Sequence, residues 1–244
     1  MAADTALTER WEGQTQVVHG VTKLFRHEPS RSGLAIWGES MLPNPDPGKY
    51  PVSIGFALSR FLTMAAGFTQ PHSLCERLED WLNNTFPKAR AWMGIDVASV
   101  IPASTSWVPV MLRVMNASSA EASVGLFRLT VLREPGPYNS ENDAALTVSG
   151  DVNADVWIDE LSAAVKRAAF RTVTRVPAVD LEARRQYLAV LTRTVSDLYA
   201  TTGIGRTIGG PVLTLGISSS DGRVSRVEPS EHGGMIISGL GQPI

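Results

Sequence analysis

Arginines at four-residue spacing have the clearest chemical meaning in this sequence. Arg167, Arg171 and Arg175 recur every four positions in a segment that we expect to be helical, so their guanidinium groups would form a stripe along it. A guanidinium group offers a planar set of donors that matches phosphate. Arg184 and Arg185 open the next expected helix, and Arg184 falls on its apolar face, where a charge requires a partner. These arginines predict contact with nucleic acid such as RNA; the alternative is a solvated face with internal salt bridges.

A second unusual feature is the concentration of glycine at the C-terminal end. Residues 203–244 hold ten of the 21 glycines. Glycine loses the most backbone freedom on ordering and has no side chain to bury. We therefore expect a neighbouring copy of the chain to hold this tail; the alternative is that it folds back onto its own domain. The residues expected at such contacts are Gly203, Gly209, Gly210, Val212, Leu213, Leu215, Ile236 and Ile237.

Other sites of chemistry are weakly indicated. The four histidines are scattered and the chain has a single cysteine, so the sequence predicts no metal site, no cofactor and no intramolecular disulfide. The glycine run 203–210 follows an expected helix, which favours a helix stop over a phosphate-binding loop. A dispersed enzyme site would use His72, Cys75 and the acids between Asp151 and Glu160. Those acids also fit the first turns of a helix, where the helix dipole favours negative charge.

The elements that must position these residues begin with a predicted helix. Leu7, Trp11, Val18, Val21 and Phe25 recur at near-helical spacing and indicate a helix that ends before residue 29. Four prolines in residues 41–51 predict an extended connector. Residues 58–66 are expected to be helical. The next helix is predicted to start at a capping box formed by residues 73 and 76 and to end before residue 87.

The hydrophobic period changes after residue 107. Alternating apolar residues predict strands over residues 108–114 and 124–132, paired as a hairpin, with a third strand over 145–149. Apolar faces over residues 152–174 and 181–200 predict two helices that pack as an antiparallel pair. The tail contains three β-like pieces, at residues 212–217, 223–227 and 235–237.

Together these elements predict an α+β fold. It would have a helical N-terminal half, a central antiparallel hairpin or small sheet, an antiparallel helix pair and an extended β-forming tail. The expected divisions are an arm and connector at 1–51, a body at 52–202 and the tail at 203–244. A net charge of −2 excludes a general basic field for polyanions. The sequence shows neither a signal peptide nor a membrane-length apolar run, so we expect no membrane partner.

These features suggest a structural protein that assembles with copies of itself. Arms, a compact body and missing catalytic signatures are typical of a viral or virus-like coat or nucleocapsid subunit, located in the virion or host cytoplasm. Its arms would pack on neighbouring copies, and the arginines would face enclosed nucleic acid. Two alternatives remain open. One is a small cytosolic enzyme or ligand-binding protein with a dispersed site, and the other is a phage tail or adaptor protein.

Overall fold

The structure is a computed structural model. It describes residues 1–3, 7–11, 14–18, 21–46, 48–87, 89, 92–104, 107–116, 126–135, 181–202, 210–218 and 221–227. Helices and strands both occur, and the main sheet is antiparallel, so the mixed α+β class is confirmed.

A five-stranded antiparallel sheet forms the centre of the fold. In spatial order its strands are β10 (Phe127–Arg133), β9 (Trp107–Asn116), β8 (Met93–Pro102), β5 (Ser32–Gly38) and β4 (Leu24–His27). The pairing of β9 with β10 confirms the predicted hairpin. Strand β8 was not predicted from the sequence, because seven of its ten residues are buried and no regular alternation of polar and apolar side chains marks it.

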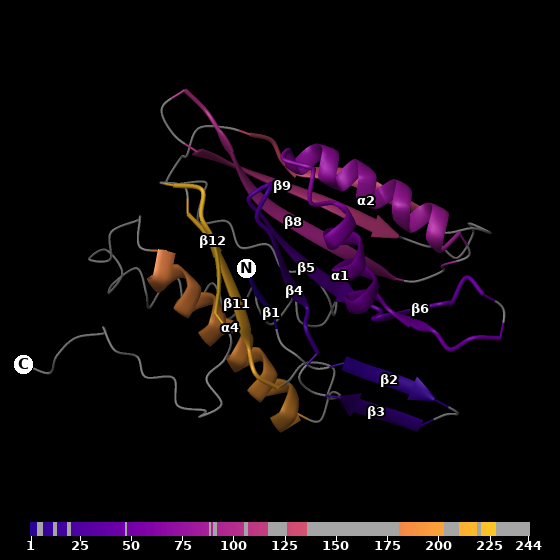
Figure 1. Cartoon of the computed structure of the whole chain (residues 1–244). Helices are drawn as coiled ribbons and strands as arrows, with labels where there is room; N and C mark the ends of the chain where they lie inside the picture. The colour runs from indigo at the N-terminus through magenta and orange to yellow at the C-terminus, as the bar shows by residue number, and fades with distance from the viewer. Residues whose placement is uncertain are drawn as a thin grey trace, which may run out of the picture.

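Two helices cover one face of this sheet (Figure 1). They are α1 (Ile54–Met64) and α2 (Pro71–Thr85), and both were predicted from their apolar spacing. Leu58 of α1 and Leu78 of α2 are fully buried against Ile95 and Val97 of β8 in the main core. The predicted capping box does not form. Because α2 starts one turn earlier, after Gln70 with Pro71 at its first position, Ser73 lies inside the helix.

The opposite face carries a second sheet and a third helix. The strands β1 (Ala2–Ala3), β11 (Leu213–Ile217) and β12 (Val224–Val227) form an antiparallel sheet in the order β1-β11-β12. Leu215 and Leu213 pack with Leu24 of β4 in a second core. The predicted helix α4 (Leu181–Thr202) contacts β1 and β11. It covers the face of this second sheet that is turned away from the main sheet (Figure 1). The described part of the chain therefore forms four layers: helices, sheet, sheet, helix.

Within the N-terminal half, the helix predicted over residues 7–25 is wrong, whereas the two later helices form as α1 and α2. Residues 7–18 form a hairpin of β2 (Leu7–Trp11) and β3 (Gln14–Val18), and β4 and β5 follow it. The near-helical spacing over residues 7–25 is interrupted at Gly13 and Gly20, and these glycines disfavour a helix. Since β4 and β5 belong to the main sheet, residues 24–38 do not form an arm apart from a body.

The proline-rich connector is flanked by two short paired strands. These are β6 (Met41–Leu42) and β7 (Val52–Ser53), and Leu42 is fully buried in the main core. The expected strand over 145–149, the helix over 152–174 with its pairing to the next, and the strand over 235–237 lie outside the described residues. In the described part of the chain, no helix combines the length and the apolar character needed to cross a membrane.

Candidate functional site

The two edge strands of the main sheet, β10 and β4, differ in how their outer backbone groups are bonded. In an antiparallel ladder, alternate residues direct their N–H and C=O groups to one neighbour and then to the other. The amide of Ile36 in β5 donates to the carbonyl of Lys23, the residue just before β4, at 3.0 Å. This bond shows which residues of β4 direct their backbone groups toward β5. Phe25 and His27 therefore pair with β5, and Leu24 and Arg26 direct their backbone groups outward.

Side chains of α2 cover the first part of the β10 edge. Asn83 Oδ1 accepts from the amide of Phe127 at 2.8 Å, and Asn83 Nδ2 donates to the carbonyl of the same residue at 3.0 Å. Glu79 Oε2 accepts from the amide of Leu129 at 2.8 Å. These contacts occupy three of the outward backbone groups that an added strand would use, which is one way in which proteins protect an exposed sheet edge.

The β4 edge has no equivalent closure among the described residues. Within them, no hydrogen bond reaches the outward backbone groups of Leu24 or Arg26. The Arg26 side chain is half exposed and pairs with Glu28 at 2.9 Å. Within the described residues, the outward backbone groups of β4 thus have no partner and lie next to a charge pair that is neutral overall.

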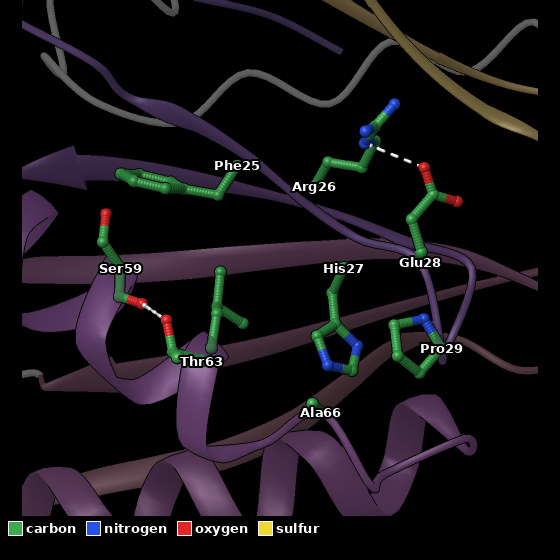
Figure 2. Close-up of a pocket in the computed structure, with 9 residues that line it drawn as sticks. Phe25, Arg26, His27, Glu28, Pro29, Ser59, Thr63 and Ala66 are labelled. Carbon is green, nitrogen blue, oxygen red and sulfur yellow. Dashed lines mark hydrogen bonds and ion pairs between the residues drawn. The ribbon is translucent and has the colours of Figure 1, made fainter.

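An open cavity of about 620 Å³ lies beside this edge. Residues 25–29 line one wall, and Ser59, Leu62, Thr63 and Ala66 of the α1 segment line the other. Figure 2 shows His27 directed from β4 toward the helix, whereas Arg26 and Glu28 point away from it. Phe25 and Leu62 supply apolar surface, and the exposed hydroxyl of Thr63 is bonded to the carbonyl of Ser59 at 3.1 Å. The cavity wall therefore combines the apolar surface of Phe25 and Leu62 with polar groups of Ser59, Thr63 and the Arg26–Glu28 pair.

The inner end of the cavity is a buried polar network. His27 Nε2 lies 3.1 Å from the carbonyl of Ala65, which can only accept, so this nitrogen carries the proton. Nδ1 therefore accepts from Ser30 Oγ at 2.6 Å. Ser30 Oγ lies 2.8 Å from Ser32 Oγ, and Ser99 Oγ donates to the Ser30 carbonyl at 2.9 Å. Because Ser30 is 1% exposed and does not line the cavity, this Ser–His pair holds the turn between β4 and β5 rather than facing a substrate.

The buried position of His27 predicts a pH-dependent stability. Burial lowers the pKa of His27 below its ordinary value of 6.5, against weaker opposing effects of the Ala65 carbonyl and Glu28. As the pH falls below about 6.5, the unfolded chain takes up a proton that the folded chain resists, so stability is lost on acidification. We expect the free energy of unfolding, measured in urea between pH 7.5 and 5, to fall by up to about 1.4 kcal/mol per pH unit. The His27→Gln variant should lose that part of the slope, and exposed His72→Gln should keep it; equal slopes in all three proteins would contradict this assignment.

The structure describes only part of the predicted nucleic-acid site. Arg167, Arg171 and Arg175 lie outside the described residues. Arg184 and Arg185 are in the first turn of α4, as expected. The Arg185 guanidinium pairs with Glu182, and its side chain is 15% exposed, so this arginine has an internal partner.

The predicted contact residues of the tail divide into two groups. Leu213 and Leu215 are buried by their own chain in the second core, so they do not form a surface for another copy. Gly210 adopts a φ of 75°, and Val212 is half-buried. Residues Gly203, Gly209, Ile236 and Ile237 lie outside the described residues.

Of the residues named for a dispersed enzyme site, the structure describes His72 and Cys75, which both lie on α2. His72 is exposed and lies 3.5 Å from Glu76 at Nε2. Cys75 is fully buried in the main core, and burial raises the pKa of its thiol to about 12, which keeps it protonated and unreactive. The acids from Asp151 to Glu160 lie outside the described residues. No cluster of three or more potential metal ligands occurs in the residues that the structure describes.

Sequence reasoning missed the β4 edge and its cavity. The available signal was the pair of short apolar runs at residues 24–27 and 32–38 around Pro29. Proline is common at the second position of a turn such as Glu28–Arg31, and such turns often connect adjacent strands.

Comparison with protein-family models, curated protein sequences and solved structures finds no match.

Proposed function

We propose that this chain is a structural subunit that assembles with copies of itself by adding a strand to the β4 edge. The observation that carries the proposal is the difference between the two edges of the main sheet. At β10, Asn83 binds the amide and carbonyl of Phe127, and Glu79 binds the amide of Leu129. At β4, the outward groups of Leu24 and Arg26 have no described partner and border a cavity lined partly by Phe25 and Leu62. Backbone pairing at an open edge is a general mode of association, with neighbouring pockets giving specificity.

The arrangement of polar groups supports assembly over catalysis. The buried hydroxyls and the His27 ring bond to one another and to backbone carbonyls. Cys75 is enclosed in the core, and burial keeps its thiol protonated. A coat or nucleocapsid subunit, found in a virion or host cytoplasm, uses such edge pairing repeatedly. A phage tail or adaptor protein would use the same contacts in a ring or a small oligomer.

Size-exclusion chromatography with light scattering tests this proposal on the full chain. We expect a mass above that of one 26.3 kDa chain that increases with protein concentration. Large particles or filaments would support the coat subunit, and rings or small oligomers would support the adaptor. A monomer at all concentrations would overturn the assembly proposal and favour the enzyme alternative.

We further propose that the assembled form contacts RNA or another nucleic acid through Arg167, Arg171, Arg175 and Arg184, without Arg185, which pairs with Glu182. Their spacing carries this proposal, since guanidinium groups along a helix can follow a phosphate backbone. The ratio of absorbance at 260 and 280 nm in the fractions of the same chromatography measures retained nucleic acid. A ratio typical of protein alone would overturn it.

A further inference from the structure

We infer that the β4 edge and its cavity accept the segment Met235–Ile237 of a second copy of this chain. The inference rests on the proposed function and names the two surfaces that meet. The acceptor consists of the outward backbone groups of Leu24 and Arg26 and the cavity between β4 and α1. The donor is the last β-like piece of the sequence.

The side chains of an added strand would lie alternately on the two faces of the main sheet. Successive side chains of an added strand point to opposite faces of the sheet, so Met235 and Ile237 share one face and Ile236 takes the other. On the helix-covered face, Met235 and Ile237 would enter the cavity and contact Phe25 and Leu62. Both are flexible or branched apolar side chains, which suits the part of the cavity wall formed by Phe25 and Leu62.

Charge and backbone properties of the donor also match the acceptor. The sequence GGMIISG over residues 233–239 carries no charge, and Arg26 and Glu28 at the rim neutralise each other. Gly233 and Gly234 have no side chains that would keep the incoming backbone from the edge. An uncharged strand beside a neutral rim avoids the cost of leaving an ion without its partner.

The length of chain after β12 allows the donor to reach another copy. Strand β12 contacts β4 and ends at Val227, so the C-terminal segment leaves from a strand that neighbours the acceptor strand. Residues 228–234 span up to about 25 Å when extended. This reach exceeds by several times the spacing of about 4.8 Å between paired strands, so the donor can cross to a copy that abuts this edge.

Cysteine cross-linking of the full chain tests the inference. Two single variants, Ser59→Cys in the cavity wall and Ile237→Cys in the donor, are tagged differently, mixed and oxidised. The native Cys75 does not interfere, because it is buried and its thiol pKa is about 12. We expect a disulfide-linked dimer that carries both tags on a non-reducing gel. The matched controls are Arg60→Cys, exposed on α1 but outside the cavity lining, and Ile236→Cys on the other side of the donor strand; both should cross-link at least tenfold less.

Each other outcome overturns a defined part of the inference. In the double variant Ser59→Cys with Ile237→Cys, a faster-migrating monomer without dimers would show that the segment docks on its own chain, which overturns the second copy as the source. Equal cross-linking of the controls, or none in any variant, would overturn the acceptor site. Light scattering on the same samples distinguishes failure of this inference from failure of the proposed function. A protein that assembles without these cross-links uses another interface. A protein that stays monomeric contradicts both proposals.

Discussion

Replacing Arg26 by proline should convert the assembled protein to monomers while leaving the monomer folded. The Arg26 amide points away from β5, so proline removes no hydrogen bond within the sheet; an outward edge position is where strands tolerate it. An added strand would lose one donor, and its own carbonyl would stay unpaired at a cost of about 1 to 3 kcal/mol. This corresponds to about a ten- to hundredfold weaker association. Light scattering over a concentration series measures the shift, and circular dichroism checks the fold.

Arg26→Ala is the matched control for this prediction. Alanine removes the same side chain and its ion pair with Glu28 but keeps the backbone amide, so the assembly should persist. Exposed ion pairs contribute about 0 to 1 kcal/mol, which leaves little effect on the fold. Particles of unchanged size from the proline variant would show that β4 is not the edge used in assembly. Equal loss of assembly in both variants would assign the effect to the side chain.

Replacing Arg113 by methionine should lower the stability of the chain by about 3 kcal/mol. Arg113 lies opposite Asp96 in the ladder of β8 and β9 and binds it through both guanidinium arms, with Nε 2.6 Å from Oδ1 and Nη2 3.0 Å from Oδ2. Asp96 is 5% exposed and also accepts from Trp37 Nε1 at 3.2 Å. Methionine removes the bidentate partner of a buried carboxylate. For a chain of this length, the melting temperature should fall by about 6 to 12 °C.

Two further variants separate the charge effect from a packing effect. Arg128→Met removes an exposed arginine from neighbouring β10 and should change the stability by less than about 0.5 kcal/mol. The double replacement of Asp96 by leucine and Arg113 by methionine should recover most of the lost stability, since apolar residues can replace a buried ion pair. Calorimetry or urea unfolding measures both. A double variant as unstable as Arg113→Met would attribute the loss to packing around Trp37 instead.

The sequence alone predicted those elements whose side chains repeat with a regular period. Helices α1, α2 and α4 each bury one apolar stripe, so the period of 3.6 residues is visible in the order of residues such as Leu74, Leu78 and Leu82. Strand β9 alternates between buried and half-buried residues, and the sequence shows this period of two. Residues 7–25 were misread as a helix because their widely spaced apolar residues fit a helical period, whereas the strands there are short and separated by glycines.

The candidate site depended on contacts between residues far apart in the sequence. Composition indicated a side-chain-poor tail, but only the packing of Leu215 on Leu24 showed that residues 213–217 lie in the chain's own second core. Likewise, no local pattern distinguishes β4 from β10 as an edge. That difference arises because α2 places Asn83 and Glu79 beside β10, 44 and 50 residues away in the chain, whereas α1 leaves a cavity beside β4. Periodicity reports which face of an element is buried, and tertiary structure alone decides which backbone edge is left for another chain.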